Sequence, residues 1–144
     1  MYSALLDTDI LSDILKGRNE TVQSREKAYL AENDSYALPI IVVMEIIKGL
    51  HKAGREDRIQ TLMARFRAAE ILTLDLQSAE LAGRICGDME REGQTIGFAD
   101  PIIAALAIRH DLTLVTGNVS HYQRIQQAGY PLRLDNWRSS APSV

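Results

Sequence analysis

The sequence predicts an α/β fold, a three-layer α/β/α sandwich in which helices cover both faces of a mostly parallel central sheet. Short apolar runs with the composition of buried strands alternate with longer segments that have helical spacing of apolar residues. The chain has 144 residues, which suits one domain, and no repeat or linker divides it. We expect a single domain over residues 1–138 and a short, polar, disordered tail over 139–144.

The predicted elements alternate along the whole chain. The strands are short apolar runs at 3–6, 36–38, 71–74, 112–115 and 132–134. The helices are expected at 10–16, 20–32, 45–52, 58–69, 78–92, from 100 onward and at 120–127. Ser78 is the expected N-cap of its helix, and Pro101 is expected at a first helical position. Residues 40–44 form a β-branched apolar run that fits a buried strand as well as a helix.

Charge is distributed unevenly along the chain. The formal net charge is -3, so the field of the whole molecule does not favour nucleic acid. Six basic residues nevertheless cluster in one stretch, which we call the basic stretch: Lys48, Lys52, Arg55, Arg58, Arg65 and Arg67. The sequence leaves two interpretations open, a solvated helical face or a track that binds the RNA backbone.

Cysteine content and apolar runs indicate the cellular compartment. Cys86 is the only cysteine, which excludes an intrachain disulfide and fits a reducing cytoplasm. Residues 1–9 do not have the basic and apolar regions of a signal peptide. The longest apolar run, 40–44, is far too short to span a bilayer. We therefore expect a cytoplasmic protein that does not associate with membranes.

Acidic residues occur where predicted strands end and helices begin. Asp7 and Asp9 follow the first strand, Glu45 adjoins the apolar run 40–44, and Asp100 begins a helix. The carboxyl ends of parallel strands meet at one edge of the sheet, where ligands bind. Carboxylates from distant segments that meet there would suit a hard cation such as Mg²⁺, and a metal of this kind supports phosphodiester hydrolysis.

Each of these acids also has a purely structural interpretation. Asp7 would end its strand, because Asp is common in turns, and Asp9 or Asp100 would cap a helix. Glu45 would be a surface residue, but apolar residues surround it in the sequence. A carboxylate held among apolar residues is costly unless it is paired or bound to a metal, so Glu45 is the least easily explained by structure alone.

Four ordered motifs resemble those of PIN-domain toxins of the VapC type. They are LLDTDILS at 5–12, MEIIKG at 44–49, ADPIIAALA at 99–107, and LVTGN at 114–118 followed by Tyr122. No single motif is specific, but the ordered set spans nearly the whole chain. The resemblance implies a PIN-like α/β/α fold and an endoribonuclease toxin that depends on Mg²⁺ or Mn²⁺. It also implies inhibition by a cognate VapB-like antitoxin, and assembly as a homodimer.

The resemblance assigns roles to particular residues. It implies that three acids bind the metal and form the catalytic set: Asp7, Glu45 and Asp100. Thr116 matches a supporting hydroxyl. Asn118 stands where many members have a fourth acid, and Asp9 stands where Asn is more usual. Both departures lie beside the three central acids, so they bear on metal number and affinity.

Two other functions remain open from the sequence. A haloacid-dehalogenase-like phosphatase would also have the pattern Asp7-Thr8-Asp9, but it needs a later lysine and a later acidic pair, and the chain has no Asp-Asp pair. A catalytically weak PIN-fold module that binds RNA or a partner is conceivable because of Asn118. The three histidines have no metal-ligand spacing and are predicted to be surface residues, although His121 could contact substrate. Trp137 is predicted to anchor the C-terminal segment by packing.

Overall fold

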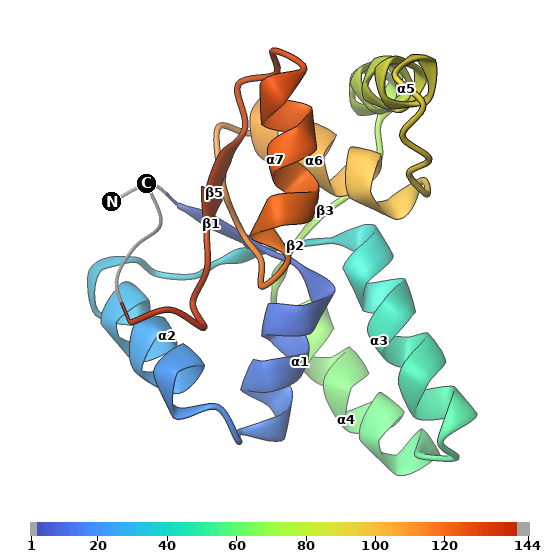
Figure 1. Cartoon of the computed structure of the whole chain (residues 1–144). Coiled ribbons are helices and arrows are strands. Elements are labelled where there is room, and N and C mark those ends of the chain that lie inside the picture. The colour runs from blue at the N-terminus through green and yellow to red at the C-terminus, as the bar shows by residue number, and fades with distance from the viewer. Residues whose placement is uncertain (1–2, 141–144) are drawn as a thin grey trace.

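The central sheet is parallel throughout. The computed structural model describes residues 3–140, and within that range five strands are arranged in the order β3-β2-β1-β4-β5 (Figure 1). The strands are β1 Ala4–Leu6, β2 Ala37–Pro39, β3 Glu70–Leu72, β4 Thr113–Val115 and β5 Arg133–Asp135. All four pairings between neighbours are parallel. This sheet confirms the α/β fold that the alternating pattern predicts.

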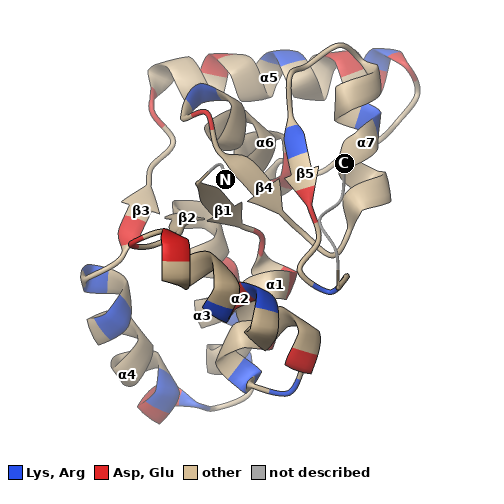
Figure 2. Cartoon of the chain, turned by 90° about the vertical axis from the view of Figure 1, so that its left-hand side faces the viewer, with Lys and Arg blue, Asp and Glu red and all other residues tan. Residues whose placement is uncertain are grey.

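Helices cover both faces of the sheet, which confirms the three-layer arrangement. The helices of residues 3–140 are α1 Thr8–Lys16, α2 Glu20–Glu32, α3 Ile40–Lys52, α4 Glu56–Arg67, α5 Leu76–Arg91, α6 Ala99–Arg109 and α7 Val119–Gln127. Figures 1 and 2 show α1 to α4 on one face and α5 to α7 on the other. This division follows from strand order, because right-handed crossovers that run outward in opposite directions from the centre of a sheet place their helices on opposite faces.

The strand order reverses between β1 and β4. These two strands lie side by side in register, with Leu5 opposite Leu114 and Leu6 opposite Val115. Leu5, Leu6 and Leu114 are fully buried, and Val115 is almost so. Asp7 extends the pairing by one residue, because its backbone N–H donates to the Val115 carbonyl at 2.9 Å. Asp7 and Asp9 therefore follow β1, and Thr116 and Asn118 follow β4, the two strands that flank the switch point of the fold, whereas Glu45 lies on α3 and Asp100 on α6.

Some helix boundaries differ from those predicted. The ambiguous run 40–44 is helical, because β2 ends at Pro39 and α3 begins at the next residue. Ser78 is not an N-cap: the helix starts at Leu76, and the Asp75 carboxylate accepts from the Ser78 backbone N–H at 2.8 Å. An Asp three residues earlier is as good a cap as Ser, so it determines the start.

The start of α6 is also earlier than predicted. The helix begins at Ala99, so Pro101 is its third residue instead of its first. Proline is tolerated there because the backbone N–H groups of the first turn have no partner within the helix. Phe98 occupies the N-cap position, which means that Asp100 is not needed as a cap and its side chain is available for other contacts.

The C-terminal segment is anchored as predicted. Trp137 is buried, and its ring packs against Tyr29 and Tyr36 at centroid distances of 5.4 and 6.3 Å. Of the tail predicted to be disordered, residues 141–144 lie outside the described residues, and the Ser139 carbonyl accepts from Arg25 at 2.8 Å. Within residues 3–140, no helix is both long and apolar enough to cross a membrane.

Candidate active site

Asp7 lies at the junction of β1 and α1. Its backbone remains extended, so it caps α1, and Oδ1 accepts from the Thr8 backbone N–H at 2.8 Å. Oδ2 accepts from the Thr116 hydroxyl at 2.8 Å. The Thr116 side chain is completely buried beyond β4. Asp7 ends its strand, as its structural interpretation predicted, and it also caps α1, a role that was predicted for Asp9. Capping uses only one oxygen of Asp7, and the other lies at the switch point.

The charge of Asp7 is poorly compensated. Burial raises the pKa of its carboxyl to about 6, although the hydrogen bonds from Thr116 and Thr8 oppose that rise. The nearby carboxylates of Asp9 and Asp100 raise the pKa further. A carboxylate whose ionised form is disfavoured by burial and by like charges would be stabilised by a cation.

Asp100 lies in the first turn of α6 and contacts two residues of α7. The Tyr122 hydroxyl donates to Oδ1 at 2.9 Å, and Nε2 of His121 lies 2.5 Å from Oδ2. Tyr122 is fully buried, and burial together with Asp7 and Asp100 raises its pKa well above the usual value. The phenol therefore remains protonated and serves as a donor between the two acids.

Sequence reasoning missed the contacts of His121 and Tyr122 with Asp100. His121 is not simply a surface residue, because its side chain is about two-thirds covered and paired with Asp100. A signal was present in the position of α7, which begins directly after the loop that follows β4. Side chains in the first turn of such a helix lie at the carboxyl edge of the sheet, where the acids lie.

Glu45 lies on α3 and reaches the same region through a threonine. The Thr8 hydroxyl donates to Oε1 of Glu45 at 3.0 Å. Because Thr8 follows Asp7 directly, this hydrogen bond connects the second acidic motif to the first. Among the flanking apolar residues, Val42 is fully buried and Met44 is exposed, so Glu45 lies at the border of the core.

Asp9 secures the loop that follows β4. Its Oδ1 accepts from the Ile10 backbone N–H at 2.8 Å, and Oδ2 accepts from the Gly117 N–H at 2.9 Å. Burial raises the pKa of Asp9, while Arg138, whose Nη1 lies 3.8 Å from Oδ2, lowers it. A Cβ at Gly117 would lie 2.6 Å from side-chain atoms of both Asp9 and Arg138, so any larger residue here would require these side chains to shift.

Asn118 is placed near the site by its backbone. Its N–H donates to Oγ1 of Thr116 at 3.0 Å. Its side chain is exposed and does not cap α7, although the residue occupies the N-cap position. Thr116 therefore connects two segments, because its hydroxyl accepts from Asn118 and donates to Asp7.

The donor set fits the chemistry of a hard divalent cation. The candidate ligands are carboxylates, and burial, together with a smaller contribution from the charges of Asp9 and Asp100, raises the pKa of Asp7. Within residues 3–140, however, no three Asp, Glu, His or Cys side chains form a ready-made metal site. Both Asp100 oxygens are engaged by α7, and Thr8 binds Glu45. Carboxylates suited to a divalent cation are therefore present, but several of their oxygens already form hydrogen bonds or ion pairs with other side chains.

Two of the surface depressions among residues 3–140 bear on the position of the candidate site. One, of about 520 Å³, is lined by α1, α3 and α4 and includes Thr8 and Glu45 at the site. Leu15, Ile46 and Leu50 are among its apolar walls, and Lys16, Arg18, Arg55 and Arg58 are its basic residues. We call this depression the α1–α3–α4 groove.

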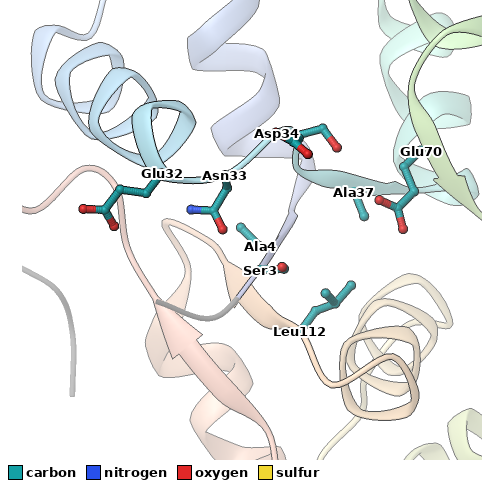
Figure 3. Close-up of a pocket in the computed structure, with 9 residues that line it drawn as sticks. Ser3, Ala4, Glu32, Asn33, Asp34, Ala37, Glu70 and Leu112 are labelled. Atoms are coloured by element: carbon teal, nitrogen blue, oxygen red, sulfur yellow. The ribbon is translucent and has the colours of Figure 1, made fainter.

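The other depression, of about 410 Å³, lies at the opposite edge of the sheet (Figure 3). Ser3, Ala37 and Glu70 line it from the amino ends of β1, β2 and β3 or just before them, together with the carboxylates of Glu32 and Asp34. A cavity lined by carboxylates disfavours a polyanion such as RNA. The groove beside Glu45 is therefore the more suitable surface for the candidate site.

Comparison with known proteins agrees with the fold and with the order of the motifs. A family model for the PIN domain matches residues 4–125. Ribonuclease VapC10 of Mycobacterium tuberculosis is 31% identical over 142 residues, which cover 95% of this chain and 98% of that protein. The chain therefore belongs to the PIN-domain family, among the VapC toxin homologues. This assignment argues against the phosphatase alternative.

Solved structures include toxin–antitoxin complexes with the same fold. VapBC2 from Rickettsia felis, bound to a DNA fragment from the promoter, superposes with a TM-score of 0.77 at 26% identity, over 93% of this chain and 98% of that chain. A toxin–antitoxin complex from Klebsiella pneumoniae has a TM-score of 0.64 at 28% identity, over 90% and 93% of the two chains. The fold similarity thus extends over most of both molecules.

Proposed function

We propose that this chain is a metal-dependent endoribonuclease toxin that hydrolyses RNA phosphodiester bonds in the cytoplasm. The observation that supports it most strongly is the arrangement of three acids beyond the switch point of the sheet. Asp7 and Asp100 both lie against Tyr122, while Glu45 reaches Asp7's neighbour Thr8. The acids come from three segments far apart in the sequence, so helix capping alone does not explain why all three lie in one region. The chain also belongs to a family of nucleases.

Some residues of the site would bind the metal, and others orient the acids that bind it. Asp7, Glu45 and Asp100 would hold Mg²⁺ or Mn²⁺, which when bound supplies the Lewis acidity that activates water for attack at phosphorus. Thr116 orients Asp7 by donating to Oδ2, and Tyr122 orients Asp100 by donating to Oδ1. Asp9 holds the loop at Gly117, which keeps Thr116 in place.

The basic stretch is suited to the RNA backbone. Lys and Arg occupy several positions along the ribbon of α4 and at its start (Figure 2). Arg55 and Arg58 line the α1–α3–α4 groove that includes Glu45, so this part of the basic stretch adjoins the acids. Lysine and arginine side chains that neutralise phosphates provide affinity without sequence preference, which fits binding of RNA despite the negative net charge.

A catalytically weak module that only binds RNA or a partner is the alternative to an enzyme. Cleavage of a generic single-stranded RNA separates the two. The enzyme should cut in millimolar Mg²⁺ or Mn²⁺ and stop when a chelator is added, whereas a binding module would shift the RNA in a gel without cutting it. Retained binding without any cleavage at all metal concentrations would contradict the enzymatic proposal.

We infer that a VapB-like antitoxin binds in the α1–α3–α4 groove. Apolar residues of all three helices line it, which suits an amphipathic segment, and Glu45 is among its lining residues. An arginine or lysine of the partner would pair with the site's carboxylates and so block metal binding. The toxin–antitoxin complexes with the same fold support a partner of this kind.

We also infer that two copies associate through the carboxyl edge of the sheet. Large apolar side chains are exposed at the starts of three helices there: Ile40 on α3, Leu76 on α5 and Phe98 before α6. Leu76 is 86% and Phe98 77% exposed, so a covering surface would remove much apolar area from water. Light scattering at micromolar concentration tests this, and a species of 16.0 kDa alone would contradict it.

A further inference from the structure

His121 occupies one oxygen of the candidate metal ligand Asp100. It lies in the first turn of α7, and its Nε2 is 2.5 Å from Oδ2 of Asp100. Arg124, one turn further along, holds the imidazole from the other side, with Nη2 at 2.7 Å from Nδ1. The Arg124 Nε also donates to the His121 carbonyl at 3.0 Å. Backbone and ring of His121 are thus both fixed by the same guanidinium.

The partners of His121 determine which ring nitrogen donates. An ionised carboxylate can only accept, so the Nε2–H of His121 donates to Asp100. Nη2 of Arg124 lies 2.7 Å from Nδ1 and 3.0 Å from Nε2, and because these distances are nearly equal it lies over the face of the ring and is not in line with the lone pair of either nitrogen. The imidazole therefore presents a directed N–H to Oδ2.

The two donors on Asp100 differ in how easily they can leave. Tyr122, on Oδ1, is fully buried and packed in the core, so it cannot rotate away without unfolding α7. The side chain of His121, on Oδ2, is 31% exposed, and that of Asp100 is 29% exposed. Oδ2 is thus the oxygen of Asp100 that a ligand from solvent can reach, provided that the imidazole moves outward.

We propose that His121 is a positioning residue that occupies Oδ2 of Asp100 in the metal-free protein, and that a divalent cation displaces it. The inference rests on the proposed function, because it takes Asp100 as a metal ligand. Among residues 3–140 no three potential ligands form a ready-made site, and His121 holds an oxygen of Asp100 that the ion would require. The imidazole competes with the metal, so it weakens metal binding while it keeps Asp100 oriented.

Metal affinity of His121 variants tests the competition directly. Free Mn²⁺, counted by electron paramagnetic resonance, gives the dissociation constant without any RNA. His121→Ala removes the competing N–H and should bind Mn²⁺ about tenfold more tightly, which corresponds to the low end of the contribution of a hydrogen bond to a charged group because this pair is partly exposed. His121→Gln keeps an N–H donor near the Nε2 position and should bind like the wild type. His110→Ala, at the exposed end of α6, is the matched control and should leave affinity unchanged. Equal or weaker Mn²⁺ binding by His121→Ala would overturn the proposal.

A second measurement on the unaltered protein guards against a folding defect in the variant. The chain has three histidines, so their ring signals can be followed individually in a Mg²⁺ titration by nuclear magnetic resonance. The His121 signals should shift in step with metal saturation, while those of His51 and His110 stay in place. If Mg²⁺ raises the melting temperature and His121 does not shift, the displacement is wrong but the metal site stands. If neither Mg²⁺ nor Mn²⁺ binds, the proposed function fails together with the inference.

Discussion

The Thr116 hydroxyl donates a hydrogen bond of 2.8 Å to Oδ2 of Asp7, which joins the segments after β4 and β1 at the switch point. The same Oγ1 accepts the Asn118 N–H at 3.0 Å, so one buried hydroxyl satisfies two groups. Without it, an acceptor and a donor would both lose their partner. The pKa of Asp7 would also rise further, because this hydrogen bond favours the ionised carboxylate.

Two replacements of Thr116 distinguish the contribution of its hydroxyl to stability from that of its methyl group. Thr116→Val keeps the shape but removes the hydroxyl, and it should lower the free energy of unfolding by about 2 kcal/mol, the usual cost of leaving buried polar groups unpaired. Thr116→Ser keeps the hydroxyl and loses only a methyl group, so it should cost about 1 kcal/mol or less. Urea denaturation of both variants provides the comparison. Equal losses in the two variants would show that the hydroxyl contributes nothing.

The raised pKa of Asp7 predicts a specific pH dependence in the metal-free protein. Because the pKa is raised from 3.8 to about 6 on folding, the folded state holds the proton more tightly. The stability from that proton is present in full below pH 3.8 and is lost as the pH rises through about 6.

Asp7→Asn has no such proton to lose. In the presence of a chelator, its unfolding free energy should therefore gain about 2–3 kcal/mol relative to wild type between pH 4 and pH 7. Millimolar Mg²⁺ should remove or reverse that gain, because the ion stabilises only the ionised carboxylate of the wild type. Denaturation curves at several pH values measure it. A constant difference between the two proteins across this range would contradict the raised pKa.

Asn118→Asp adds a fourth carboxylate beside the site. Repulsion from the existing acids should destabilise the metal-free protein and lower its melting temperature. The loss of unfolding free energy should be about 1 kcal/mol or less, because the side chain is exposed. Mg²⁺ should relieve that repulsion, so the metal-induced rise in melting temperature should be larger than in the wild type. Gln123→Glu adds the same charge at an exposed position of α7 and serves as control. Equal metal-induced shifts in Asn118→Asp and wild type would mean that Asn118 is remote from the metal.

Two exposed helical glycines distinguish partner binding from stability. Gly49 lines the α1–α3–α4 groove, whereas Gly83 lies on α5, and a Cβ at either position would meet nothing within 4 Å. Leucine at each position should stabilise its helix by about 0.5–1 kcal/mol. Only Gly49→Leu should weaken binding of the VapB-like antitoxin proposed to occupy the groove, by about tenfold or more. Equal affinity of the two variants in calorimetry would place the partner elsewhere.

The part of the site that could be predicted from sequence follows from the rule for parallel strands. Asp7 and Thr116 directly follow the predicted strands 3–6 and 112–115, and because the carboxyl ends of parallel strands meet at one edge, the sequence places both residues there. The hydrogen bond between them confirms this. Asp9 was expected nearby as well, but its bond to the Gly117 N–H depends on a backbone approach that no side-chain pattern reveals.

The remaining features depend on packing between distant segments. Residues 40–44 could not be assigned from the sequence, because β-branched apolar residues suit a buried strand and a buried helix equally. In the structure β2 ends at Pro39, and these residues form the start of α3. The pairing of His121 with Asp100 depends on how α7 packs beside α6. Histidine spacing along the sequence contains no information about that contact, since the partner is an aspartate 21 positions earlier.

RNA cleavage by Asp100→Asn tests the central assignment most directly. Asparagine keeps an acceptor for Tyr122 but removes the charge, so the variant should fold with a melting temperature close to that of the wild type. Its Mg²⁺-dependent cleavage should fall about 100-fold or more, because a metal ion contributes several kcal/mol to stabilising the transition state. Asp34→Asn, at the opposite edge of the sheet (Figure 3), is the matched control and should cut at the wild-type rate. If Asp100→Asn folds and cuts RNA in Mg²⁺ as fast as the wild type, the assignment of Asp100 to the active site is wrong.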